Sequence, residues 1–115
     1  MTETKVIVGG DLAEDAAAFL DAWHRAERGD ISEKTVLAFE TWEALAAVMT
    51  GERYRLLRYV HAHPEPSVSA LARALGRQYR RVHADVAALE QVGLLDRSEG
   101  RVQTNIDRIT AEIML

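Results

Sequence analysis

The sequence predicts an α+β fold that is mainly helical, and three observations support that class. Apolar residues keep helical spacing through Ser67–Gly76 and again through Gly76–Leu89, so two helices are expected to meet at a glycine. The second of these runs is basic at its start. Two short β-prone pieces then flank a turn at residues 98–100. A helix, a tight turn, a basic helix and a hairpin in this order predict a winged helix-turn-helix, which is a DNA-binding arrangement.

Residues 1–50 predict a strand-helix-strand arm followed by a linker helix. Lys5–Val8 is a β-branched run that two glycines end, and Thr35–Phe39 is a second β-prone run. Between them, Asp11 and Glu14 have the spacing of a capping box, which starts a helix that extends to about residue 28. The apolar stripe of this helix includes Leu12, Phe19 and Trp23.

Two further helices are expected before the helix-turn-helix. Thr41 has the position of a cap for a short helix over Trp42–Met49, and Thr50 has the same position for a helix from Gly51 to about His61. The residues that this last helix is expected to bury are Tyr54, Leu57 and Val60, with Leu56 as a further candidate.

The helix-turn-helix divides into core and outward positions. Ser67 or Ser69 caps its first helix, and Gly76 suits a left-handed exit. The residues of the first helix that are expected to face inward are Leu71, Ala72 and Leu75. The stripe of the second helix that must face the core is Val82, Val86 and Leu89.

The outward surface of the second helix holds the residues that are expected to contact DNA. At roughly 100° per residue, one outer flank is expected to hold Gln78, Arg81 and Asp85. The rest of its N-terminal surface is formed by Tyr79, Arg80 and His83. This end of a recognition helix usually enters the major groove, where arginine can bind guanine and glutamine can bind adenine. A solvated charged face is the alternative interpretation.

The hairpin that follows is a candidate wing. Arg97 and Arg101 flank its turn, and Glu99 lies at its tip. In a winged helix the hairpin lies along the DNA backbone or minor groove, where arginines neutralise phosphate, whereas an ordinary exposed hairpin has no such role. The residues expected to contact DNA are therefore Ser67, Ser69, Arg77, Gln78, Tyr79, Arg80, Arg81, His83, Arg97 and Arg101.

The charge of the chain is divided between its halves. The net charge is −4, with four basic and ten acidic residues in 1–51 (−6) and ten basic and eight acidic residues in 52–115 (+2). Because salt screens charges over about 8 Å, a local basic patch can bind DNA on an acidic protein. The sequence has no run of about 20 apolar residues and no leader pattern, so a cytoplasmic, non-membrane protein is expected.

Two parts are predicted: 1–50, which forms a dimer interface, and 51–115, which holds the winged helix and a C-terminal strand. The alternation of apolar residues from Ile109 to Leu115 is strand periodicity. The two β-prone runs of the arm could pair with each other or with this strand. The residues expected to build a homodimer interface are Leu12, Phe19, Trp23, Leu37, Phe39 and Ile113.

Residues 39–115 resemble the small winged-helix predicted transcriptional regulators related to the MarR and ArsR superfamily. The resemblance lies in FETWEALAAVMTGERYRLLRYV, in SVSALARALGRQYRRVHADVAALEQVGLL and in the closing hairpin with IDRITAEIML. It implies a DNA-binding homodimer that represses or autoregulates a small operon. Some members look like antitoxin partners of small ribonuclease-type toxins, so a small protein toxin is a further implied partner.

Catalysis, metal binding and a cofactor are not expected. The chain has no cysteine, which excludes thiolate metal sites and cysteine nucleophiles. His61 and His63 are two positions apart, so on a helix they point in different directions. Gly9 and Gly10 follow a β-prone run, but no phosphate-binding glycine motif surrounds them. The remaining alternative is a protein-interaction module on a winged-helix scaffold, with the acidic arm as its working surface.

Overall fold

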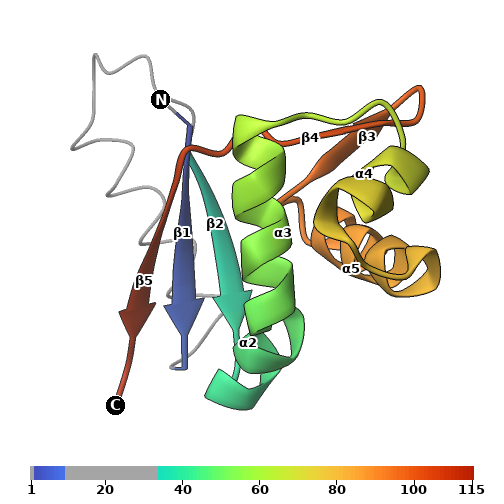
Figure 1. Cartoon of the computed structure of the whole chain (residues 1–115). Helices are drawn as coiled ribbons and strands as arrows, with labels where there is room; N and C mark the ends of the chain where they lie inside the picture. The colour runs from blue at the N-terminus through green and yellow to red at the C-terminus, as the bar shows by residue number, and fades with distance from the viewer. Residues whose placement is uncertain (1, 10–33) are drawn as a thin grey trace. The chain divides into compact units, whose positions relative to one another are not determined.

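The structure is a computed structural model that describes residues 2–9 and 34–115. These residues form four helices and five strands, so the chain is α+β as the sequence predicts (Figure 1). They divide into two compact units. One unit combines the described residues up to Ala47 with Ile106–Leu115, and the other is Val48–Asn105. The expected helix over residues 11–28 lies outside the described residues.

The first unit is built on a parallel sheet. Strand β1 (Glu3–Val8) lies between β2 (Lys34–Phe39) and β5 (Arg108–Ile113), and it runs parallel to both (Figure 1). The three consecutive apolar residues Val6–Val8 are all buried, as a central parallel strand requires. The sequence left two pairings open for the β-prone runs, and both occur: the runs pair with each other, and Lys5–Val8 also pairs with the C-terminal strand.

The C-terminal strand belongs to a different part of the chain from the one expected. It was expected with residues 51–115, but β5 pairs with β1. The Arg108 guanidinium donates to the Glu3 carboxylate at 2.9 Å, and the Asp107 amide donates to the Thr2 carbonyl at 2.8 Å. The physical reason is that a strand buried along both faces, such as β1, also needs hydrogen-bonding neighbours at both of its edges.

The next two helices begin where their caps predict. The Thr41 hydroxyl accepts from the Ala44 amide at 3.1 Å before α2 (Trp42–Val48). The Thr50 hydroxyl accepts from the Arg53 amide at 3.2 Å before α3 (Gly51–Ala62). Each bond satisfies an amide that the first helical turn would otherwise leave without a partner.

One core residue predicted for α3 is wrong. Tyr54 is 50% exposed, and Leu56 is fully buried with the expected Val60 and Leu57. The Tyr54 ring instead lies beside the Arg58 guanidinium, 5.8 Å from it. Leu56 fills the core position, so Tyr54 can stay at the surface, where its hydroxyl remains hydrated and no buried hydrogen-bond partner is needed.

The second unit is organised around α4 (Val68–Leu75) and α5 (Tyr79–Gln91), which are joined by residues 76–78. Ser67 rather than Ser69 caps α4, since its hydroxyl accepts from the Ala70 amide at 3.0 Å. Gly76 ends α4 in the left-handed region, with φ 65° and ψ 34°, as predicted. The next amide, that of Arg77, donates back to the Ala72 carbonyl at 3.1 Å, so the turn is tightly defined.

A short hairpin completes this unit. Strands β3 (Asp96–Ser98) and β4 (Arg101–Gln103) are antiparallel, and Glu65, which precedes α4, forms a bridge with Val102 of β4. Leu75, expected inside, is only half-buried, while Val68 is buried. The fully buried side chains that form the core of this unit are Leu56, Val60, Leu71, Val82, Val86, Leu89, Leu95 and Val102.

Within the described ranges, no helix has both the length and the apolar character needed to cross a bilayer.

The hairpin turn offers a stability test. Glu99 (φ 53°) and Gly100 (φ 84°) both have positive φ, which is the pattern of a type I′ turn. Because an L-residue with a long side chain is unfavourable there, Glu99→Asn is expected to raise the free energy of unfolding by about 0.5–1 kcal/mol. Glu99→Val is expected to lower it by about 1 kcal/mol. Urea denaturation measures both, and equal midpoints for the three chains would contradict the turn.

Candidate nucleic-acid interface

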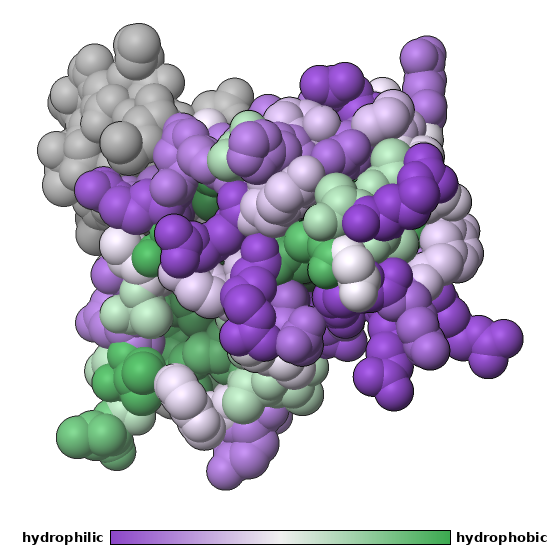
Figure 2. Space-filling model, viewed as in Figure 1, coloured by the Kyte–Doolittle hydropathy of each residue, from purple (hydrophilic) through white to green (hydrophobic). Residues whose placement is uncertain are grey.

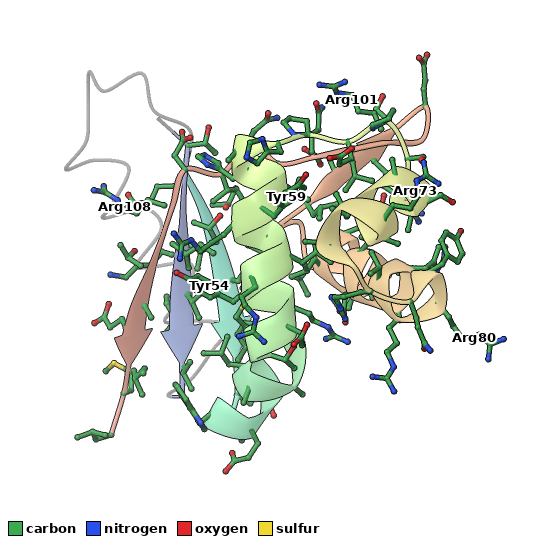
Figure 3. All side chains as sticks on the ribbon, in the orientation of Figure 1. Tyr54, Tyr59, Arg73, Arg80, Arg101 and Arg108 are labelled. Carbon is green, nitrogen blue, oxygen red and sulfur yellow. The ribbon has the colours of Figure 1, made fainter. Side chains whose placement is uncertain are left out.

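The N-terminal end of α5 presents a cationic surface. Arg80 and Arg81 are exposed, as are Gln78, Tyr79 and His83 around them. In Figure 3 the Arg80 side chain extends from the helix into solvent, and Figure 2 is hydrophilic over the same region. The Tyr79 ring lies 5.7 Å from the His83 imidazole, so these two rings form one flank of the surface.

The guanidinium groups of this surface carry uncompensated charge. In the part of the chain that the structure describes, neither Arg80 nor Arg81 forms an ion pair or a side-chain hydrogen bond. The sequence explains this, because no acidic residue occurs between Ser67 and Ala84. Both cations are therefore available to an anionic partner.

The backbone adds to this surface. Gln78 occupies the N-cap position of α5, but its side chain makes no capping hydrogen bond. Thr50 and Ser67, in contrast, cap α3 and α4 with their hydroxyl groups. The first amides of α5 are thus not capped by a side chain, and they lie at the positive end of the helix dipole. Amides in this position can donate to a phosphate group.

Arg77 has a different environment from its neighbours. Its Nη2 donates to Asp85 Oδ2 at 2.7 Å, and its Nε lies 3.3 Å from Glu52 Oε2. Arg53 of α3 donates from Nε to the other Asp85 oxygen at 3.0 Å and from Nη1 to the Val48 carbonyl at 3.1 Å. We call Glu52, Arg53, Arg77 and Asp85 the ion network. It joins α3, the turn and α5.

The prediction that Asp85 lies on the outer flank of α5 is wrong. Its side chain is only 13% exposed and contacts both arginines, whose side chains are each 20% exposed. Helical geometry alone placed it beside Arg81, but an aspartate can be buried when two guanidinium groups compensate its charge. The Arg77 guanidinium is correspondingly directed into the second unit, with a buried Nη1 that has no hydrogen-bond partner among the described residues.

The exposed end of the ion network is acidic. The pKa of Glu52 is lowered, first by the hydrogen bond that Arg55 donates at 2.7 Å and by the charge of the same residue, and further by Arg77. A lowered folded-state pKa means that this interaction favours folding above the ordinary value of 4.5. The contribution disappears as the pH falls through the folded-state pKa.

The hairpin arginines are less free than those of α5. Arg97 pairs with Glu90 at 3.1 Å, and its side chain is 31% exposed. Arg101 is exposed and donates only to the Gln103 side chain, at 3.3 Å. Glu99 at the tip is also exposed. Of the two hairpin residues expected to contact DNA, Arg101 is the one with an available charge.

Sequence reasoning did not single out Arg73. This residue lies in the last turn of α4, is exposed, and forms no ion pair within the described residues (Figure 3). The signal was present, since Arg73 belongs to the same acid-free stretch as Arg80 and Arg81. The hydroxyl of Ser67 is already used as a helix cap, whereas Ser69 is exposed.

Three of the residues predicted for a dimer interface, Leu37, Phe39 and Ile113, lie on one face of the sheet. Phe39, Val8 and Ile113 occupy the same level of β2, β1 and β5, so Phe39 and Ile113 share one face of the sheet. Leu37 is two positions before Phe39 and lies on that face as well. Ile113 is 48% exposed. The other predicted contacts lie outside the described residues, namely Leu12, Phe19 and Trp23.

Comparison with protein families gave a match over the second unit. The family model HVO_A0114 matches residues 48–111, which include the whole second unit and the start of β5. The comparisons with curated proteins and with solved structures each found no match.

The ion network can be tested by removing its central charge. Asp85→Asn keeps the shape of the side chain but removes the negative charge that faces two largely buried arginines. The expected loss in the free energy of unfolding is about 2–4 kcal/mol. Glu90→Gln is the matched control on the same helix, because Glu90 pairs with Arg97 in a more exposed position. Its expected loss is about 0–1 kcal/mol. Equal losses in denaturant titrations would show that Asp85 has no special structural role.

Proposed function

The chain belongs to the HVO_A0114 family, and we propose that its unit Val48–Asn105 is a winged helix-turn-helix that binds double-stranded DNA. In this proposal α4 and α5 form the helix-turn-helix, with α5 as the recognition helix. The β3–β4 hairpin is the wing. The protein acts as a homodimeric transcriptional regulator, most simply a repressor or an autoregulator.

The order and connections of the elements support the winged-helix assignment. Helices α3, α4 and α5 precede the hairpin, and the turn between α4 and α5 contains the left-handed Gly76. The backbone of Glu65 exchanges two hydrogen bonds with Val102 of β4, at 3.1 and 2.8 Å. The segment before α4 is thereby joined to the hairpin, so the candidate wing is an integral part of the unit rather than an appended loop.

The observation that carries the DNA proposal is the uncompensated charge at the start of α5. Arg80 and Arg81 are exposed without counter-ions in the described structure, beside amides that no side chain caps. Phosphate is recognised by arginines and helix N-termini, and base edges are recognised by side chains of the same helix end. A solvated surface without a ligand needs no such concentration of one sign of charge.

The proposal gives the residues different roles. Arg80, Arg81 and Gln78 contact base edges or phosphates, since their side chains can form bidentate hydrogen bonds with guanine or adenine. Tyr79 and His83 contribute phosphate or base contacts from the adjacent flank. Arg73, Ser69 and Arg101 are candidates for the backbone, because they are exposed on α4, at its start and on the hairpin.

Arg77 acts as a positioning residue in this proposal. Its charge is already neutralised by Asp85 and Glu52, and its backbone amide is bonded to the end of α4. It therefore fixes the angle at which α5 leaves the turn. Arg97 has an intermediate position, because Glu90 must be displaced before its guanidinium can bind phosphate.

The contact residues can be tested by titration against DNA. Arg80→Ala and Arg81→Ala are expected to weaken binding to a duplex from the region upstream of the protein's own coding sequence. The expected loss is about 1–3 kcal/mol where the residue binds guanine. A lost phosphate contact instead reduces the log–log salt slope by about 0.9. Arg58→Ala is the control, since Arg58 is an exposed arginine of α3 in the same unit. Fluorescence anisotropy at several salt concentrations measures both quantities.

The outcome against this proposal is equally clear. If Arg80→Ala, Arg81→Ala and Arg58→Ala all bind as the unchanged chain does, or if no duplex binds, the surface does not recognise DNA. The alternative function, an interaction module that binds a protein such as a small toxin, then takes precedence.

Arg77 gives a second, independent test. Arg77→Gln is expected to lower the thermal midpoint and to weaken DNA binding, because α5 loses its anchor to the turn. The salt slope should stay unchanged, since the charge of Arg77 is neutralised within the protein. A slope reduced as much as in Arg80→Ala would place Arg77 on a phosphate instead.

A further inference from the structure

Strand β5 lies at one edge of the sheet that the described residues form. It is an outer strand of the β2–β1–β5 sheet, and among the described strands only β1 pairs with it. An outer strand presents amides and carbonyls to whatever lies beside it, so proteins usually protect such edges with charged residues, proline, a bulge, or a covering helix or loop. Residues 108–113 contain no proline, their register with β1 is continuous, and their two charged residues, Arg108 and Glu112, are of opposite sign, so a partner strand can match them.

Apolar residues are concentrated along the same strand. Ile109 is 37% exposed, Ile113 is 48% exposed and Met114, directly after the strand, is 53% exposed. Figure 2 shows hydrophobic surface at the lower end of the strand, beside the C-terminus. On β2, the other outer strand, Leu37 and Phe39 are partly buried. Of the two outer strands of the described sheet, β5 is therefore the one with the more exposed apolar side chains.

The direction of the backbone groups restricts how this edge can pair. The Met114 amide donates to the Val8 carbonyl of β1 at 2.9 Å. Because successive residues of a strand direct their backbone groups to opposite edges, the amides of Ile109, Ala111 and Ile113 face away from β1. These three residues would form the hydrogen bonds to any strand added at the edge.

We propose that β5 pairs antiparallel with β5 of a second copy of this chain, about a two-fold axis that passes by Thr110. In this register Ala111 of one copy faces Ile109 of the other, and both are residues whose amides face outward. Arg108 then lies opposite Glu112 of the second copy, and the same pair recurs on the other side of the axis. Opposite charges that face each other across two strands stabilise the pairing.

The charges of each copy are available for this contact. The side chains of Arg108 and Glu112 are 58% and 44% exposed, although each has a partner in its own sheet, Glu3 and Lys5 respectively. A parallel arrangement in the same register would instead place like charges opposite one another. A two-fold antiparallel interface is also closed, so it gives a dimer and not a filament.

This inference rests on the proposed function in one respect, because it supplies the surface for the homodimer proposed there. Its test uses no DNA, so the two can fail separately. A chain that dimerises through β5 but binds no duplex supports the interface and overturns only the proposed function.

A symmetric cross-link tests the register. In the proposed pairing, Thr110 faces Thr110 of the second copy in a pair without hydrogen bonds, with Cα atoms about 4.5 Å apart. This separation lies within the range of a disulfide. The chain has no cysteine, so Thr110→Cys can form only an intermolecular bond. Mild oxidation at micromolar concentration is expected to convert most of this variant into a covalent dimer. Ser98→Cys, at an exposed hairpin position, should remain largely monomeric.

A second variant tests the hydrogen bonds of the edge. Ala111→Pro removes an outward amide and leaves the bonds to β1 intact, and outer strands tolerate proline at such a position. Light scattering is expected to give twice the chain mass for the unchanged protein and the single chain mass for Ala111→Pro, with unchanged circular dichroism. An unchanged chain that is monomeric overturns the proposal. So does a Thr110→Cys variant that cross-links no faster than Ser98→Cys, or a dimeric Ala111→Pro.

Discussion

The second unit depends on one carboxylate. Asp85 accepts a hydrogen bond from Arg53 of α3 and another from Arg77 of the turn, with one oxygen for each. A charge with this little exposure is tolerated only because two guanidinium groups face it, and those groups are in turn fixed by it. The start of α5 is consequently held against α3, and the direction in which the next residues of α5 point follows from that. The candidate interface is thus positioned by a residue that takes no part in it.

Internal ion pairs, within the ion network and outside it, also decide which cations remain available. Arg77, Arg97 and Arg108 each have a carboxylate partner within the structure, and their charge is used internally. Arg80 and Arg81 have none in the described part of the chain. An acidic protein of net charge −4 can therefore present a cationic surface, because the acidic residues of its second half lie outside the stretch from Ser67 to Ala84. The position of the charges, and not their sum, supports the proposed DNA binding.

The sheet of the first unit is held together by contacts between residues that are far apart in the sequence. Its strands come from both ends of the described chain, and the residues joined by the Arg108–Glu3 ion pair are 105 positions apart. Val6–Val8 are buried in the middle strand, while the large apolar residues of β5 are partly exposed at the outside. The backbone amides and carbonyls of an interior strand pair with two neighbouring strands. An outer strand pairs along one edge only, so the backbone groups of its other edge have no partner within the sheet. This difference is the reason that we propose β5, and not β1, as the strand that pairs with a second copy.

The sequence by itself determined most of the local features: the caps at Thr41 and Thr50, a cap for α4 at Ser67 or Ser69, the left-handed Gly76, and the exposed start of α5. Each of them depends on residues within about one helical turn of one another, so spacing and side-chain chemistry are sufficient. Only the tertiary structure decided that Asp85 is buried, that Arg77 points inward and that the C-terminal strand joins β1. Arg53 and Asp85 are 32 positions apart, and helical periodicity carries no information on which distant charge will compensate a buried one. Such contacts form only when distant segments of the chain pack together, so local sequence patterns cannot predict them.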